Sequence, residues 1–305
     1  MPKTLSMIIS GILVLVSIQT FAAFFRDMFQ AVPAHKEPAP TAKLGQKLFF
    51  DPILSAGNKY SCNDCHQKNK AFSGFSNQQD VPTLLNVTYM YTFFWNGRAL
   101  TLSEALEEHL LSPTLMGQEE NTLIEALKSN PEYVSEFETA YENGIALSTV
   151  IDALASYLET LTTPYSRFDQ YITGNVNAFN EKERTGFELF KSYGCASCHQ
   201  GRNVGGNLMQ KFGIYRNYFQ NPSAYDLGLF QFTKNEEDRF VFRVPSLRNI
   251  ALTAPYFHNG SAQTLADAIR IMGQYQLNRE IPDQDVEKIE AFLQTLSGSM
   301  ERLND

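Results

Sequence analysis

CNDCH at residues 62–66 and CASCH at residues 195–199 are two copies of one pattern, Cys-x-x-Cys-His, and they contain all 4 cysteines of the chain. This spacing is the covalent haem-attachment motif. Two cysteines on a helical turn can each form a thioether with one vinyl group of a haem, and the adjacent histidine can reach the iron. The residues expected to hold two haems are Cys62, Cys65 and His66 in the first copy and Cys195, Cys198 and His199 in the second.

Other uses of paired cysteines fit this pattern less well. A thioredoxin-type motif does not need a histidine beside it in both copies, and a tetrahedral zinc site would leave each copy short of ligands. The sequence therefore predicts a c-type cytochrome with two covalently bound haems.

The composition predicts an all-α protein. At 305 residues and 43% hydrophobic residues, the chain can bury the cores of about two domains. Residues that favour helices dominate, and alternating strand patterns are scarce. The formal net charge of −8 argues against binding to nucleic acid and suits docking to a small basic electron donor.

The N-terminal 25 residues have the pattern of an export segment. One positive charge precedes an apolar run that ends near a small-x-small site, Thr20-Phe21-Ala22, as in a secretory signal peptide. The run of about 21 residues is also long enough for an uncleaved membrane anchor. Polar residues in its second half favour the signal peptide. Either way, the rest of the chain is expected outside the cytoplasm, after a proline-bearing extended linker at residues 26–43.

Internal matches predict a tandem duplication. VPTLLNV at 81–87 is echoed by VPSLRNI at 244–250, and FWNG at 94–97 by FHNG at 257–260. Both matches have the same offset of 163 residues, which is the mark of a repeat. We therefore expect two cytochrome-c-like haem domains with long irregular loops, at residues 44–175 and 176–305. The second half carries about 30 extra residues between its haem motif and the echo.

The repeat also suggests the remaining iron ligands. A helix with a capping-box-like start is expected after Thr101 and again after Thr264. His109 and Met272 occupy matching positions on the inward faces of these helices. From the residues alone, Met272 is either an iron ligand or a core methionine, and His109 is either a ligand or a surface histidine. Trp95 is either an electron relay between the haems or a core tryptophan.

At this point the sequence resembles the bacterial di-haem cytochrome c peroxidase family, which includes the methylamine-utilisation-type di-haem enzymes. The resemblance extends from Leu44 to Gly298. It is carried by LGQKLFFDP at 44–52, FWNGRA at 94–99, VPSLRN at 244–249, PYFHNG at 255–260 and IMG at 271–273.

The resemblance implies a periplasmic peroxidase. A C-terminal haem bound by His199 and Met272 would accept electrons from a small cytochrome c or cupredoxin. These electrons would pass Trp95 to an N-terminal haem bound by His66, where hydrogen peroxide is reduced to water. The resemblance also implies a homodimer. It further implies a calcium ion held by Asp80 and the backbone carbonyls of Thr253 and Pro255, which are oxygen ligands of the kind calcium prefers.

The chain departs from the family at the distal side of the first haem. The family uses a glutamine and a glutamate to help break the O–O bond, and those positions are Ala105 and Leu115 here. His109 is the remaining candidate. It either stands off the iron as an acid–base, with Glu108 orienting it, or it binds the iron and closes the site.

Two other functions stay open. One is a non-enzymatic electron carrier in which two histidines bind the first iron. The other is a methylamine-type enzyme that oxidises residues of a partner protein. That subgroup carries tyrosine where Met272 stands, which disfavours this alternative.

Overall fold

The structure is a computed structural model that describes residues 28–76 and 79–300. The predicted signal peptide or anchor at residues 1–25 lies outside these ranges. Within them, no helix is both long enough and apolar enough to cross a membrane.

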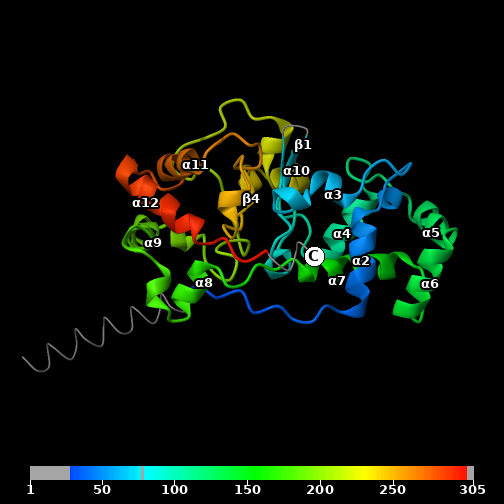
Figure 1. The fold of residues 1–305 in the computed structure, drawn as a ribbon. Helices are drawn as coiled ribbons and strands as arrows, with labels where there is room; N and C mark the ends of the chain where they lie inside the picture. Colours follow the sequence, from blue (N-terminus) through cyan, green and yellow to red (C-terminus); the bar gives the residue numbers. More distant parts are fainter. Residues whose placement is uncertain (1–27, 77–78, 301–305) are drawn as a thin grey trace, which may run out of the picture.

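The described chain is rich in helix, as predicted (Figure 1). Helices of the first part are α2 (Pro40–Phe50), α3 (Cys62–Cys65), α4 (Leu102–Leu111), α5 (Glu120–Lys128), α6 (Pro131–Ala140) and α7 (Leu147–Thr160). Helices of the second part are α8 (Arg167–Ile172), α9 (Glu181–Tyr193), α10 (Phe230–Thr233), α11 (Leu265–Ile271) and α12 (Asp283–Gln294). In Figure 1, α9, α11 and α12 lie at one end of the molecule, and α2 and α4–α7 lie at the other.

Short strands lie between these two groups of helices (Figure 1). β1 (Gly74–Ser76) pairs antiparallel with β2 (Gln79–Val81), and β3 (Met209–Lys211) pairs antiparallel with β4 (Val241–Arg243). Each strand has only 3 residues. A strand this short shows too little alternation to be recognised in the sequence.

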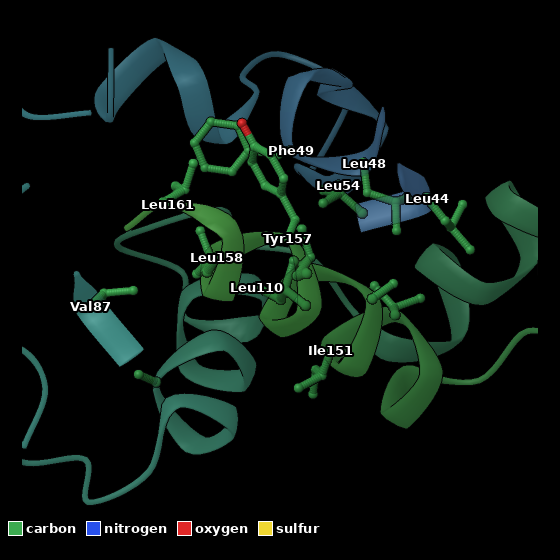
Figure 2. Close-up of a cluster of buried hydrophobic side chains, with 14 of the residues drawn as sticks. Leu44, Leu48, Phe49, Leu54, Val87, Leu110, Ile151, Tyr157, Leu158 and Leu161 are labelled. Carbon is green, nitrogen blue, oxygen red and sulfur yellow. The ribbon is translucent and has the colours of Figure 1, made fainter. Parts of the chain in front are cut away.

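The first hydrophobic core is built by α2 crossing α7 (Figure 2). Leu48 and Phe49 of α2 are buried against Leu154 and Leu158 of α7. α2 begins at Pro40, four residues before the predicted start at Leu44. Proline is tolerated in the first helical turn, where its missing N–H would have no intrahelical partner. Of the three prolines within the predicted linker, at positions 33, 38 and 40, the last therefore belongs to α2.

The second core repeats this arrangement with α9 crossing α12, where Phe187 and Phe292 are buried. A glycine allows the close crossing in both cores. A Cβ atom on Gly45 would collide with the carbonyl oxygen of Ala153, and one on Gly186 would collide with that of Lys288. Only glycine lets the two backbones approach so closely.

Hydrogen bonds among buried side chains join the two cores. Asn86 Nδ2 and Asn249 Nδ2 both donate to Thr163 Oγ1, at 2.8 and 2.9 Å. The backbone N–H of Thr163 donates back to Asn86 Oδ1. Asn86 and Asn249 are the matching residues of the internal repeat, and both adopt a left-handed backbone conformation. Asparagine tolerates that conformation better than most residues.

The linker prediction for residues 26–43 holds for residues 33–39, which have no regular secondary structure and are mostly exposed, but it is wrong for residues 28–32 and for Pro40 onward, where α2 begins. Phe29 is buried in the second core, where its ring lies 5.5 Å from that of Phe168. The carbonyl oxygen of Met28 accepts a hydrogen bond from the N–H of Gly201 at 2.7 Å. The segment then runs to α2 in the first core. It is a strap between the two cores: Phe29 and Val32 are buried against the second core, and the mostly exposed residues 33–39 lead to the first core.

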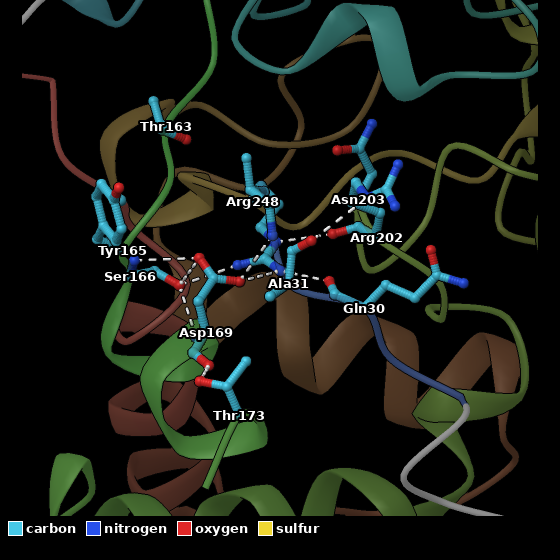
Figure 3. A network of polar contacts seen from close by, with 12 residues as sticks. Gln30, Ala31, Thr163, Tyr165, Ser166, Asp169, Thr173, Arg202, Asn203 and Arg248 are labelled. Atoms are coloured by element: carbon cyan, nitrogen blue, oxygen red, sulfur yellow. Dashed lines mark hydrogen bonds and ion pairs between the residues drawn. The ribbon is translucent and has the colours of Figure 1, made fainter. Parts of the chain in front are cut away.

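A buried ion pair anchors this strap (Figure 3). Arg248 Nη2 lies 2.7 Å from Asp169 Oδ1, and neither side chain is more than 5% exposed. Arg248 also donates to the carbonyl oxygen of Gln30, and Asp169 accepts from the backbone N–H of Val32. The pair therefore holds residues 30–32 of the strap against the second core.

We expect Asp169→Asn to lower the free energy of unfolding by about 3–5 kcal/mol, because it leaves the Arg248 guanidinium buried without a counter-charge. Urea denaturation of the haem-loaded protein would measure the change. Asp283→Asn is the matched control, since Asp283 is 83% exposed in its ion pair with Arg270 and should cost less than about 1 kcal/mol. Equal effects of the two substitutions would contradict the anchoring role of Arg248 and Asp169.

Candidate haem sites

The first Cys-x-x-Cys-His motif lies on a single turn of helix, α3. Asp64 Oδ2 accepts hydrogen bonds from the backbone N–H and the hydroxyl of Ser61, at 2.7 and 2.8 Å, which caps this turn. The backbone N–H of His66 then donates to the carbonyl oxygen of Cys62. The helical turn brings both thiols and the imidazole to one region, as expected for attachment of a haem.

The second motif forms a tighter, 3-10 turn over Cys195–Ser197. Gly194 adopts a left-handed conformation at the end of α9, with φ of 99°, and leads directly into this turn. As in the first motif, the N–H of the histidine, His199, donates to the carbonyl oxygen of the first cysteine, Cys195. The two motifs therefore present the same groups on slightly different backbones.

All four cysteines are free of disulfide bonds, and the first thiol of each motif is held in its neutral form. Burial raises the pKa of Cys62 to about 12 and, likewise, the pKa of Cys195 to about 12. Redox-active and metal-binding cysteines instead need a lowered pKa, because the thiolate is the reactive form. Burial thus keeps the first thiol of each motif protonated, which disfavours a thioredoxin-type redox pair.

Each motif histidine has one ring nitrogen committed to the backbone. His66 Nδ1 lies 3.1 Å from the carbonyl oxygen of Pro82, and His199 Nδ1 lies 3.3 Å from that of Val204. A carbonyl oxygen can only accept, so Nδ1 carries the proton and Nε2 is left as a lone-pair donor for a metal. Burial lowers the pKa of His66 to about 3 and that of His199 to about 4, which keeps both imidazoles neutral.

The second motif opens into a cavity of about 490 Å³ whose lining includes Cys195, Cys198, His199 and Met272. The structure thus brings Met272 to the same cavity as His199, which the repeat had suggested. α11 ends at Ile271, and a π-helical turn follows over Met272–Gln276. Such turns occur frequently at functional sites.

His109 faces the first motif. It lies near the end of α4, which begins with the predicted capping box between Thr101 and Glu104. The centroid of its ring is 6.2 Å from that of His66. His109 Nδ1 lies 2.8 Å from the carbonyl oxygen of Ala105, so that His109 also has Nε2 free. Burial lowers the pKa of His109, and the imidazole is neutral. The surface alternative for His109 is therefore wrong.

The predicted orienting role of Glu108 is also wrong. The carboxylate of Glu108 accepts a hydrogen bond from Arg98 Nε at 2.6 Å, whereas the Nδ1 partner of His109 is the Ala105 carbonyl oxygen. Residues 108 and 109 are neighbours on a helix and point in different directions. Glu108 acts on Arg98 instead.

Trp95 lies between the two sites. Its Nε1 donates to the backbone carbonyl oxygen of Asp80 at 3.2 Å, and its ring packs edge-on against His258 at 6.1 Å. Trp95 lines the second cavity, while the preceding residue, Phe94, stacks on His109 at 4.9 Å. Two consecutive side chains thus contact the two sites.

Sequence reasoning missed the residues that surround Trp95 and His258. His258 Nε2 lies 2.7 Å from Asp226 Oδ1 in a buried pair. Asp226 comes from the extra residues of the second half, where no motif marked it. Arg243, which lies over the Trp95 ring at 5.7 Å, belongs to a stretch next to the repeat. The burial of Arg243 depends on the tertiary packing and could not be predicted from the sequence.

The candidate calcium ligands Asp80, Thr253 and Pro255 all line the second cavity. Burial raises the pKa of Asp80 to about 7, although the nearby Arg243 guanidinium opposes this shift. A bound cation would compensate for this buried carboxylate. Among residues 28–76 and 79–300 there is no cluster of three or more His, Cys, Asp or Glu side chains that could hold a metal. The predicted donor set differs from such a cluster because two of its three ligands are backbone carbonyls.

Comparisons with known proteins agree with this arrangement. The family model described as di-haem cytochrome c peroxidase matches residues 39–177. The chain is 41% identical over 276 residues to a cytochrome c551 peroxidase of Nitrosomonas europaea, covering 86% of this chain and 81% of that one. It is 36% identical over 283 residues to the cytochrome c peroxidase Ccp of Escherichia coli, covering 88% of this chain and 61% of that one.

Solved structures share the fold. A MauG-like protein associated with microbial copper homeostasis superposes with a TM-score of 0.76 at 24% identity, covering 88% of this chain and 95% of that chain. The di-haem peroxidase BthA of Burkholderia thailandensis superposes with a TM-score of 0.68 at 21% identity, covering 89% and 90% of the two chains.

Proposed function

The chain belongs to the di-haem cytochrome c peroxidase family and is an oxidoreductase that acts on peroxide, and we propose that it works in the periplasm with a small soluble cytochrome c or cupredoxin as electron donor. The observation that carries this proposal is the 41% identity to a cytochrome c551 peroxidase over 86% of the chain. The export pattern of residues 1–25 supports the compartment. If that segment is retained, it tethers the enzyme to the membrane.

We propose that both haems are covalently attached. Cys62, Cys65 and His66 would hold the first, and Cys195, Cys198 and His199 the second. The neutral thiols and the free Nε2 atoms support this assignment. When bound, the haems supply the iron chemistry that exchanges electrons with the donor and with peroxide.

We propose that Met272, together with His199, would hold the iron of the second haem. Its support is the shared lining of the 490 Å³ cavity and the match to His109 in the repeat. A methionine ligand raises the reduction potential of a haem, which suits a site that accepts electrons from a partner.

For the first site we propose that His109 binds the iron opposite His66 in the resting enzyme. A metal held by two imidazole nitrogens at about 2 Å each lies between ring centroids roughly 6 Å apart. The observed separation is 6.2 Å, and both Nδ1 atoms are engaged elsewhere. Peroxide can then enter only when His109 withdraws.

Once withdrawn, His109 would act as the acid–base. Its neutral Nε2 can take the proton from the near oxygen of hydrogen peroxide and return it to the far oxygen, which leaves as water. Reduction of one peroxide to two waters consumes two electrons and two protons. The family's distal glutamine and glutamate are replaced by Ala105 and Leu115, so this imidazole is the buried base available on that face.

We propose that the internal repeat reflects two haem domains that arose by tandem duplication, predicted at residues 44–175 and 176–305. Because Phe168 of α8 packs in the second core, the second domain begins before α8. Matching residues share unusual conformations: Phe94 and Phe257 have positive φ, as do Asn86 and Asn249. We also propose Trp95 as the electron relay, because its neighbour Phe94 contacts the first site while its own ring lines the second.

We further propose that the protein binds a calcium ion and forms a homodimer, as the resemblance to the family implies. The shared lining of Asp80, Thr253 and Pro255 and the buried Asp80 carboxylate support a calcium ion at the second cavity. Its role would be to hold residues of the two halves together beside Trp95.

A second candidate function is a non-enzymatic electron carrier. The ring of His109 facing that of His66, together with Ala105 and Leu115 at the distal positions, favours it, because a permanently closed iron transfers electrons without reacting with peroxide. A methylamine-type oxidase of a partner protein is disfavoured by Met272.

We expect His109→Ala to reduce peroxide turnover with a reduced cytochrome donor by about 10²–10⁴-fold, because the acid–base is lost. Absorption spectra should at the same time show the first haem changing from low spin to high spin. If the carrier hypothesis holds, the unmodified protein consumes no peroxide and the variant begins to react with it. Unchanged turnover and unchanged spectra in the variant would contradict both roles of His109.

We expect Met272→His to lower the reduction potential of the second haem, because a second histidine removes the stabilisation of reduced iron by sulfur. A spectroscopic redox titration would measure the shift. Met116→Leu serves as control, since Met116 packs against the first core and its loss should leave both potentials in place. A potential that does not respond to Met272→His would show that sulfur does not bind this iron.

A further inference from the structure

A stack of three planar groups lies at the first site. The Arg98 guanidinium covers one face of the Phe94 ring, with Cζ 3.5 Å from the ring centroid. The Phe94 ring also stacks on the His109 imidazole, with centroids 4.9 Å apart and planes inclined by 10°. His109 in turn faces His66. Phe94 therefore contacts both Arg98 and the imidazole.

Arg98, the outer member of this stack, is held in place by two side chains. Arg98 Nε donates to Glu108 Oε1 at 2.6 Å, and Arg98 Nη1 donates to Asn96 Oδ1 at 2.9 Å. Asn96 is itself buried. Glu108 precedes His109 on α4, so the helix that carries the imidazole also carries the carboxylate that fixes Arg98. A guanidinium bound on its edge retains its flat face for stacking.

Phe94, the middle member, is fixed through its backbone. Its φ is +60°, a left-handed conformation that is uncommon for a bulky residue. The carbonyl oxygen of Phe94 accepts a hydrogen bond from Arg243 Nε at 3.2 Å. Arg243 is 3% exposed and lines the second cavity. A residue held in such a conformation by its surroundings presents its ring in one direction.

We propose that Phe94 and Arg98 are positioning residues that clamp the His109 imidazole in the place opposite His66 and so control how readily the first iron opens to an incoming ligand. This inference rests on the proposed ligation by His109. His109 has a helical backbone that does not move away as a loop would. Its imidazole leaves the iron only by rotating about its side-chain bonds, and that rotation separates its ring from the Phe94 ring.

The clamp predicts graded opening of the first site. In the reduced, haem-loaded protein, carbon monoxide should bind slowly to the first iron because it must wait for His109 to withdraw. Phe94→Leu removes the stacked ring and should raise the binding rate roughly 3- to 10-fold, the range expected from the loss of one aromatic stack. Phe94→Tyr keeps the ring and should bind at the original rate. The measurement is stopped-flow absorption in the Soret region.

Further variants keep the test interpretable. His109→Ala is the reference for a fully open site and should bind fastest. Arg98→Lys keeps the charge but loses the flat face, and it should also raise the binding rate. It replaces Phe94→Leu as the test if that variant does not fold. Phe93→Leu is the matched control, because Phe93 is the preceding buried phenylalanine of the first core, and it should leave the rate unchanged.

The outcomes separate the clamp from the proposed function. Suppose that His109→Ala binds carbon monoxide fast but Phe94→Leu and Arg98→Lys bind it at the original rate. This result would overturn the clamp and leave the ligation by His109 standing. A His109→Ala that binds no faster than the original protein would overturn the ligation, and the clamp with it. An equal increase in Phe93→Leu would assign the effect to loosened packing and would also overturn the clamp.

Discussion

One extended stretch, residues 80–82, forms hydrogen bonds with residues of both candidate haem sites. The carbonyl oxygen of Pro82 accepts a hydrogen bond from His66 Nδ1, and the carbonyl oxygen of Asp80 accepts one from Trp95 Nε1. The backbone N–H of Asp80 donates to the carbonyl oxygen of His258. The histidine of the first motif, Trp95 and a residue that lines the second cavity are thus hydrogen-bonded to one short backbone segment. Any displacement of this stretch acts on both sites, because backbone hydrogen bonds transmit position directly.

The two halves use one framework for different chemistry. In each half a pair of helices crosses at a glycine, and an asparagine donates a hydrogen bond to Thr163. In each half Nδ1 of the motif histidine is hydrogen-bonded to a backbone carbonyl oxygen. They diverge where the opposite face of the haem would lie. A regular helix presents His109 in the first half, and a π-helical turn presents Met272 in the second. Since the axial ligand is a main determinant of haem potential, the proposed ligation by His109 and by Met272 would give the two sites different potentials.

The clamp on His109 also connects to the second cavity. Arg243 lines that cavity and holds the carbonyl oxygen of Phe94, whose ring lies on His109. Burial lowers the pKa of Arg243 to about 10, while the Asp80 carboxylate favours its charged form. A buried cation therefore lies beside Trp95 and touches the backbone of the clamp.

Features that depend on local spacing or on similarity between segments could be predicted from the amino-acid sequence alone. The two haem motifs, the helical class, the capping box before His109 and the internal repeat were all readable, because each depends on residues a few positions apart or on direct similarity between segments. The pairing of Met272 with the second motif followed from the repeat.

Only the tertiary structure decided which distant groups meet. The strap from residue 28 to the first core, the Arg248–Asp169 pair, the Asp226–His258 pair and the stack of Arg98 and Phe94 on His109 join residues with no sequence pattern between them. Glu108 was assigned to His109 because they are neighbours in the chain, yet the helix turns it toward Arg98. Such contacts depend on how helices cross and where loops return, and burial then selects the partner that satisfies each polar group.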